Sequence, residues 1–220
     1  MKRFSFFRSL YYLRETNVFD EMKKPILCLI LLAVVQCLMA QNWDINTVHH
    51  INSWHGSFIH NYSSFISTTE PYIALGLPFT MMGVGWWKHD EALMKDALYV
   101  GVAVVGSFAL CYGTKYIVDR PRPFNAYPDL IHARSIESSP SFPSGHTASA
   151  FALATSLCIK YPKWYVIAPS ALWVTSVGLS RMHEGVHYPT DVMAGAALGV
   201  GCAIGSIYVS RWLNKLFFDK

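Results

Sequence analysis

Three short polar blocks, each at one end of a hydrophobic segment, hold the residues that could do chemistry. They are Lys-Tyr-Ile-Val-Asp-Arg-Pro-Arg-Pro at residues 115–123, Pro-Ser-Gly-His at 143–146, and a Ser-Arg pair with a later His and Asp within 180–191. Together they offer cations, a small-residue turn, two histidines and a carboxylate. This set suits metal-independent cleavage of a phosphate ester, because cations can hold the phosphoryl oxygens while one histidine attacks phosphorus and another protonates the leaving oxygen.

Three cations in these blocks are candidate phosphate ligands. Arg122 and Arg181 can each hold two phosphoryl oxygens through the guanidinium fork, whereas Lys115 acts as a point charge. Lys115 lies near the end of an apolar segment. A charge there is unfavourable unless the side chain reaches the membrane surface or has an anionic partner, so either explanation fits this lysine.

The third block pairs a histidine with a carboxylate. Pro189 and Thr190 indicate the start of a helix, which places His187 just before it and Asp191 in its first turn. A carboxylate at this spacing can bond one imidazole nitrogen and leave the other free to attack phosphorus. The plainer alternative is that Asp191 only complements the helix dipole.

The second block predicts the N-terminus of another helix. Ser144 is a suitable N-cap, and Gly145 lets the backbone approach an anion closely. Free N–H groups and the positive end of the helix dipole would then face a phosphate, with His146 beside it.

Composition indicates an all-α membrane protein. Of the 220 residues, 52% are hydrophobic, and they gather in runs at 25–40, 71–87, 97–118, 146–161, 164–180 and 191–209. We expect a helical bundle of five core transmembrane helices plus an N-terminal signal peptide or sixth helix. All five cysteines fall inside these hydrophobic runs, which indicates small apolar residues in helices and does not indicate a disulfide framework. The net charge of +4 does not indicate nucleic acid as a partner.

The expected organisation has four parts. Residues 1–40 are a basic region with a signal peptide or signal anchor, and 41–70 form an external, interfacial segment. Residues 71–210 are the core membrane domain, and 211–220 form a cytoplasmic tail. Ala40 is a candidate cleavage residue, and Met22, which precedes Lys23 and Lys24, is an alternative start to Met1.

The distribution of Lys and Arg predicts the orientation. The basic N-terminus and the short loops at 88–96 and 160–163 belong in the cytoplasm by the positive-inside rule. All three polar blocks then meet on the external face. In a bacterium this is the periplasmic face of the inner membrane.

The ordered pattern Lys-x6-Arg-Pro, Pro-Ser-Gly-His, Ser-Arg-x5-His-x3-Asp resembles the type 2 phosphatidic acid phosphatase (PAP2) superfamily, in its integral-membrane branch. The resemblance implies a phosphohistidine on His187, which Asp191 orients, with His146 as the general acid. It also implies that phosphate is bound by the remaining matching residues, which are Lys115, Arg122, Arg181, Ser144 and Gly145. The Lys-x6-Arg spacing favours Arg122 over the neighbouring Arg120. No metal or cofactor is implied.

Several alternatives stay open. Residues 183–187 spell His-Glu-x-x-His, the zinc-protease helix motif, although Gly185 and Pro189 disfavour a helix there. A vanadium haloperoxidase has a similar site but is soluble. A non-enzymatic membrane protein with a vestigial site is a third alternative. A phosphotransferase could use the same histidine to pass the phosphoryl group to an alcohol.

An external site and short loops favour a lipid phosphate as substrate, presented from the surrounding membrane lipids. The candidates are lipid A, undecaprenyl pyrophosphate, phosphatidylglycerol phosphate and phosphatidic acid. The loop at 120–143 could contact the head group through Phe124, Tyr127, Ile131 and Arg134. The sequence leaves the substrate and the oligomeric state undetermined.

Overall fold

The structure is a computed structural model in which residues 42–217 are described. The chain divides into two compact units, Met1–Trp43 and Asp44–Lys220, and every element discussed here belongs to the second. The predicted signal peptide or sixth helix at 25–40 and the alternative start at Met22 fall outside the described residues.

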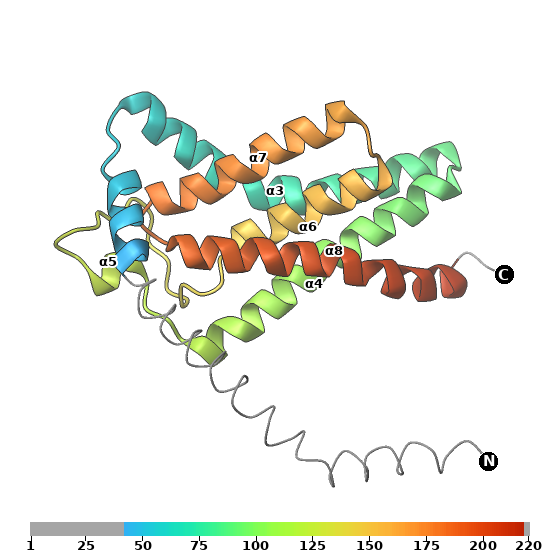
Figure 1. Ribbon diagram of the computed structural model, residues 1–220. Coiled ribbons are helices and arrows are strands. Elements are labelled where there is room, and N and C mark those ends of the chain that lie inside the picture. The colour runs from blue at the N-terminus through green and yellow to red at the C-terminus, as the bar shows by residue number, and fades with distance from the viewer. Residues whose placement is uncertain (1–41, 218–220) are drawn as a thin grey trace, which may run out of the picture. The chain divides into compact units, whose positions relative to one another are not determined.

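The second unit is built from helices and loops, as Figure 1 shows. Residues 44–52 are helical, and six further helices follow. They are α3 (Ser57–Lys88), α4 (Glu91–Val118), α5 (Pro123–Ala126), α6 (Gly145–Lys160), α7 (Trp164–His183) and α8 (Pro189–Phe217). No strand occurs among the described residues, so the all-α prediction is confirmed.

Local sequence explains where the helices begin and end. Asp90 is the N-cap of α4 and accepts a hydrogen bond from the backbone N–H of Leu93 at 3.0 Å. The same helix ends at Asp119, which adopts φ 47°, directly before the Arg120-Pro121 pair. Pro189 opens α8, where its missing N–H costs nothing because the first turn has no internal acceptor for it.

Helix α3 differs from the sequence expectation. The first core helix was expected from residue 71, but α3 begins at Ser57 and continues through Pro71 and Pro78. Gly56, with φ 131°, makes the turn that precedes it. Ile66 in the added part packs into a cluster with residues of α7, and this tertiary packing stabilises a helix that two prolines would otherwise interrupt.

Helix α6 contacts α3, α4, α7 and α8. Its contact with α8 depends on two glycines. A Cβ atom added at Gly195 would lie 2.5 Å from the carbonyl oxygen of Ser144, and one at Gly199 would lie 2.3 Å from that of Ala148. Small residues therefore let the two helices pack closely within the chain. At Gly201, further along α8, nothing lies within 4 Å of such an atom.

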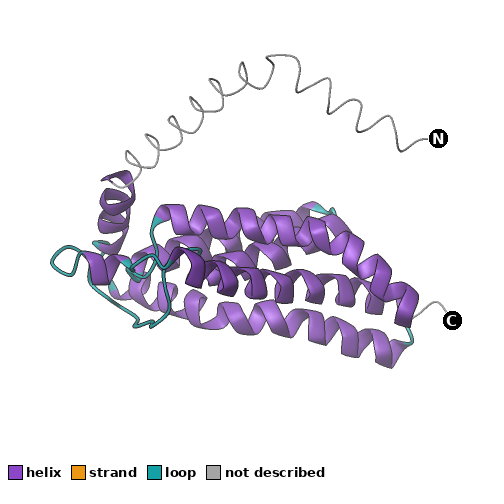
Figure 2. Cartoon of the chain, turned by 90° about the horizontal axis from the view of Figure 1, so that it is seen from below, coloured by secondary structure: helices purple, strands orange, loops and turns teal. Residues whose placement is uncertain are grey.

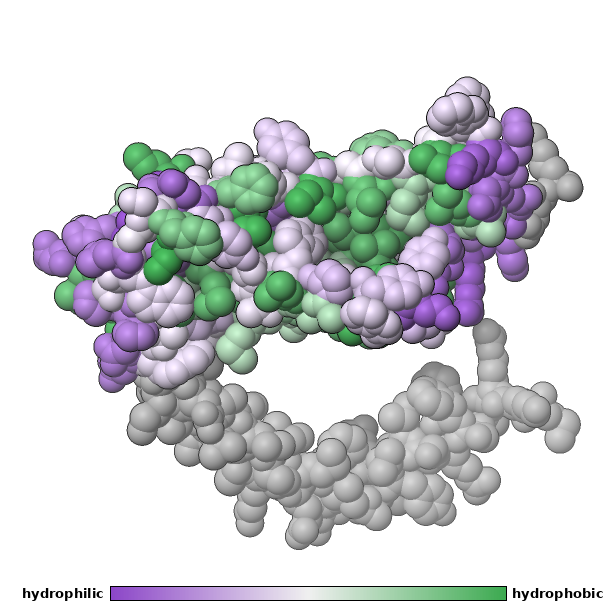
Figure 3. All heavy atoms as spheres, turned by 90° about the horizontal axis from the view of Figure 1, so that it is seen from above, coloured by the Kyte–Doolittle hydropathy of each residue, from purple (hydrophilic) through white to green (hydrophobic). Residues whose placement is uncertain are grey.

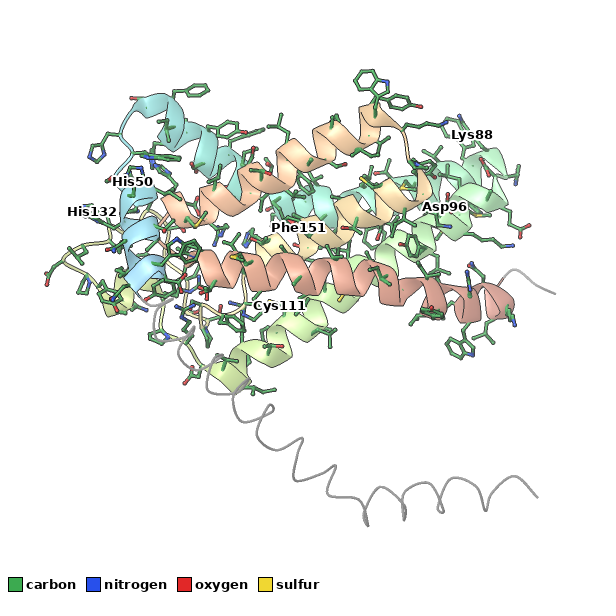
Figure 4. All side chains as sticks on the ribbon, in the orientation of Figure 1. His50, Lys88, Asp96, Cys111, His132 and Phe151 are labelled. Atoms are coloured by element: carbon green, nitrogen blue, oxygen red, sulfur yellow. The ribbon has the colours of Figure 1, made fainter. Side chains whose placement is uncertain are left out.

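Hydrophobic surface separates two polar ends on the face seen in Figure 3. In Figure 4, Lys88 and Asp96 mark one end, and His50 and His132 lie at the other. Among the described residues, two segments are long and apolar enough to cross a membrane, Glu91–Ala126 and Pro189–Phe217. The number of five core spans stays a prediction.

Candidate active site

The three polar blocks meet at one end of the second unit. Helices α4 and α7 end there, while α6 and α8 begin there, and the long irregular loop gathers beside them (Figure 2). The backbone N–H of Ser141 donates to the carbonyl of Arg120 at 2.8 Å, and that of Ser144 donates to the carbonyl of Asp191 at 3.0 Å. The first bond joins the first block to the loop just before the second block, and the second bond joins the second block to the third.

Arg122 points into this junction and is only 1% exposed. Its Nε donates to the carbonyl of Ser139 at 2.7 Å, and its Nη1 donates to the carbonyl of Val186 at 3.0 Å. The same Nη1 lies 3.4 Å from His187 Nε2. Backbone acceptors from two loops therefore fix the guanidinium beside the predicted nucleophile.

Arg181, at the end of α7, approaches from another side and is 3% exposed. Its Nη1 lies 2.8 Å from a carboxylate oxygen of Glu184 and also donates to the hydroxyl of Ser67. This ion pair and hydrogen bond hold the guanidinium, while Nη2 faces Glu137.

Glu137 was not identified from the sequence, yet it joins the two arginines. One carboxylate oxygen lies 2.7 Å from Arg122 Nη2, and the other pairs with Arg181 Nη2. Burial alone disfavours the charged carboxylate, but attraction to Arg181 and Arg122 outweighs it and lowers the pKa of Glu137 to about 2. The carboxylate oxygens occupy positions that two phosphoryl oxygens could take.

Lys115 reaches the same region from α4 and is 8% exposed. Its ammonium group donates to the carbonyl of Pro140, which also lies 3.5 Å from Arg122 Nη2. The lysine therefore points at the protein interior beside Arg122 and does not extend to the membrane surface.

His187 is 1% exposed and lies just before α8, as the sequence predicts. Burial, followed by the positive charges of Arg181 and Arg122, lowers its pKa well below 6.5. The imidazole is therefore neutral at neutral pH, which a nitrogen nucleophile requires. Its Nδ1 lies 3.6 Å from Asp191 Oδ2, longer than a hydrogen bond.

Asp191 is fully buried, and both of its oxygens have closer partners. Oδ1 lies 2.6 Å from Arg120 Nη1, and Oδ2 accepts the backbone N–H of Tyr188 at 2.9 Å. Arg120 also pairs with Asp44 through Nη2 at 2.8 Å. The two neighbouring arginines thus face different partners, Arg120 toward Asp191 and Arg122 toward His187.

Asp44 is a second residue that the sequence analysis missed. One carboxylate oxygen accepts the backbone N–H of Thr190 at 3.1 Å, and the other accepts the hydroxyl of the same residue. Asp44 therefore satisfies an N–H group in the first turn of α8, although it lies 146 residues away in sequence. A lone aspartate has no spacing pattern that could have revealed this contact.

The Pro-Ser-Gly-His block opens α6 as predicted, with Ser144 at the N-cap position. Its side chain makes no capping bond, however, and instead lies 2.9 Å from the hydroxyl of Thr147. His146 in the first turn lines a cavity of about 330 Å³, which Glu137 and Arg181 also line. The helix N-terminus thus lies beside the two arginines, where its dipole favours an anion.

Of the four loop residues predicted to contact the head group, one lines the cavity and two anchor the loop. Arg134 lines the cavity, and its guanidinium also donates to the carbonyl of Asn52 at 2.9 Å. Ile131 is 2% exposed and packs with Phe124 against the helix at 44–52, so these two side chains hold the loop in place. Tyr127 is 38% exposed.

The His-Glu-x-x-His segment does not form the helix that a zinc protease needs. Helix α7 ends at His183, and Gly185 has φ 76°, so the two histidines do not share a helical face. Glu184 is paired with Arg181. Among the described residues, no three His, Cys, Asp or Glu side chains form a group that could hold a metal ion.

An all-α unit with this ordered set of cations and histidines defines a class of phosphate-handling membrane proteins, and comparison identifies the family. The model of the PAP2 superfamily matches residues 96–215. The chain therefore belongs to the PAP2 superfamily, and the predicted family, enzyme class and membrane character are confirmed.

Two curated relatives extend the match. The lipid A 1-phosphatase of Porphyromonas gingivalis is 30% identical over 192 residues, which is 84% of this chain and 38% of that protein. The undecaprenyl-diphosphatase BcrC of Bacillus subtilis is 27% identical over 180 residues, or 80% of this chain and 82% of that protein.

The fold also matches a solved structure, that of Aquifex aeolicus LpxE. The TM-score is 0.66 at 24% identity, and the match covers 76% of this chain and 95% of that one. This similarity supports the helical architecture.

Proposed function

We propose that this protein hydrolyses a lipid phosphate monoester or pyrophosphate through a phosphohistidine on His187, without a metal. One observation carries the proposal: the guanidinium groups of Arg122 and Arg181 converge on one anion position, and His187 Nε2 lies 3.4 Å from Arg122. A phosphoryl group at that position would have two cations on its oxygens and a neutral imidazole beside phosphorus.

In the first step, the Nε2 lone pair of His187 attacks phosphorus, and the bond from phosphorus to the leaving oxygen breaks. The negative charge of the bound phosphate favours the protonated form of His146. His146 then donates its proton to that oxygen, and the lipid leaves as an alcohol or as a lower phosphate. Lys115, Arg122 and Arg181 neutralise the charge that develops on the phosphoryl oxygens. Asp191 stabilises the positive imidazole that forms, since its carboxylate lies 3.6 Å from Nδ1.

In the second step, water attacks the phosphohistidine. His146, now neutral, takes a proton from the water, and the nitrogen–phosphorus bond breaks to release inorganic phosphate and free His187. The first-turn N–H groups of α6, including those that follow Ser144 and Gly145, would bind the phosphoryl oxygens throughout both steps.

The substrate class rests on the relatives and on the placement of the site. Those relatives are named for lipid A and for undecaprenyl diphosphate, so both lipids are candidates here, with phosphatidylglycerol phosphate. The site lies at one end of the second unit, and Lys88 lies at the opposite end (Figure 4). By the positive-inside rule, the site would face the periplasm from the bacterial inner membrane.

The test is phosphate release by purified protein in detergent, with EDTA, from a panel of these lipid phosphates. We expect release from at least one lipid by the wild type and none by His187→Ala. Release that EDTA abolishes and zinc restores would overturn the metal-independent mechanism. Transfer of the phosphoryl group to an added alcohol, without free phosphate, would identify a phosphotransferase.

A further inference from the structure

The phosphate position proposed above is already filled by a side chain of this protein. The Glu137 carboxylate contacts Arg122 Nη2 at 2.7 Å with one oxygen and Arg181 Nη2 with the other. A substrate phosphate cannot use these two N–H donors while the carboxylate bonds both.

The two arginines each keep other partners that do not occupy this position. Arg122 is held by the carbonyls of Ser139 and Val186, and Arg181 by the carboxylate of Glu184 at 2.8 Å. The Glu184 side chain is 7% exposed, whereas that of Glu137 is 28% exposed. Glu137 is therefore the partner that can leave toward solvent, and the guanidinium groups would stay in place when it does.

Loss of charge does not release Glu137 at ordinary pH. Although burial opposes ionisation, Arg181 and Arg122, with smaller effects of His187 and His146, lower its pKa to about 2. The carboxylate remains charged wherever the enzyme would work, so it leaves only when another anion competes for the arginines. Glu137 therefore behaves as an internal ligand that competes with other anions for Arg122 and Arg181.

We infer that Glu137 is a resident counter-ion that occupies the phosphate position in the free protein and is displaced by the phosphoryl group of the substrate. The inference rests on the proposed function, because it assigns the same position to the substrate phosphate. When Glu137 returns after hydrolysis, it competes with inorganic phosphate for the arginines and speeds release of the product. Without it, the site would hold Lys115, Arg122 and Arg181 with only the Glu184 carboxylate beside Arg181 to balance their charge, and it would bind free phosphate tightly.

The test is binding of inorganic phosphate to the full-length protein in detergent, measured by titration calorimetry. We expect Glu137→Gln to lower the Kd for phosphate by about tenfold, because the variant removes a negative charge that opposes the ligand. Glu137→Asp keeps the charge and should bind phosphate much more weakly than Glu137→Gln. Glu91→Gln also removes one carboxylate, 55% exposed at the start of α4, and should leave the Kd unchanged.

Equal or weaker phosphate binding by Glu137→Gln would overturn the inference, since it would show that the carboxylate organises the arginines and does not block them. Lipid hydrolysis by the wild type together with this result would leave the proposed function intact. Tighter phosphate binding by Glu137→Gln, in a protein that releases no phosphate from any lipid, would support the counter-ion and contradict the function. Product inhibition by phosphate should strengthen in the same variant by a similar factor.

Discussion

Arg120 Nη1 lies 2.6 Å from Asp191 Oδ1, so the first polar block supports the carboxylate of the third directly. Arg122, two residues later, faces His187 instead. The proline between them fixes the backbone so that the two side chains serve different parts of the site. One arginine positions the acid behind the nucleophile, and the other is placed to bind phosphate.

Substitution of these arginines should therefore have different effects. Arg120→Ala leaves a fully buried carboxylate without its cation and should lower the free energy of unfolding by about 3 kcal/mol. Arg122→Lys keeps the positive charge and should destabilise the fold less than Arg120→Ala, but it should raise KM by about tenfold, because an ammonium group cannot hold two phosphoryl oxygens in the same way. Thermal unfolding and steady-state kinetics on both variants measure the contrast. The same loss of stability in both would contradict this division of roles.

Asp44 should act on the reaction through Arg120 and the start of α8. We expect Asp44→Asn to lower kcat while KM changes little, because the phosphate ligands stay in place and only the support of Asp191 weakens. Asp90→Asn is a matched control, since Asp90 also accepts a helix N–H group but at the start of α4. A kcat effect of equal size in both variants would show that Asp44 serves stability alone.

The close contact between α6 and α8 should depend on Gly199. In Gly199→Ala the new Cβ would lie 2.3 Å from the carbonyl of Ala148, so the helices must separate, at a cost of about 2 kcal/mol in unfolding free energy. Gly201→Ala places the same methyl group where nothing lies within 4 Å and should not destabilise the fold. Thermal unfolding in one detergent compares them directly, and a similar midpoint for both variants would argue against this packing.

The depressed pKa of His187 predicts how stability depends on pH. Burial, Arg181 and Arg122 hold the folded-state pKa well below 6.5, and unfolding returns it toward that value. Below pH 6.5 the unfolded chain therefore binds a proton that the folded chain does not, and folding stability falls as pH falls. Between about pH 7.5 and about pH 5, the thermal unfolding midpoint of His187→Gln should fall less than that of the wild type. Parallel curves for wild type and variant would show that this histidine is not desolvated.

The sequence predicted the helical class and the residues of the three blocks because both depend on local patterns. Hydrophobic runs mark α4 and α8, and the block residues follow fixed spacings at helix ends. Helix α3 was mispredicted at its start because contacts with α7 decide that Ser57 and its neighbours are helical. The three blocks lie at the ends of α4 and α7 and at the starts of α6 and α8. Because successive helices run in opposite directions, the sequence could predict that these ends meet on one side.

Glu137 and Asp44 could not be found in the same way. Each is a single acidic residue whose partners are fixed by tertiary structure, with Asp44 lying 76 residues before Arg120. The Lys-x6-Arg spacing favoured Arg122 as the phosphate ligand, but the pairing of Arg120 with Asp191 is likewise a tertiary contact. Such contacts need coordinates, because no periodicity or spacing in the sequence encodes them.

The most direct test of the account is to trap the phosphoenzyme. A lipid phosphate labelled on phosphorus is mixed with the protein, quenched rapidly in alkali to preserve a nitrogen–phosphorus bond, and the labelled peptide is sequenced by mass spectrometry. We predict label on His187, formed as fast as the lipid product appears and absent from His187→Ala. Rapid phosphate release with no label on His187 would contradict the phosphohistidine mechanism.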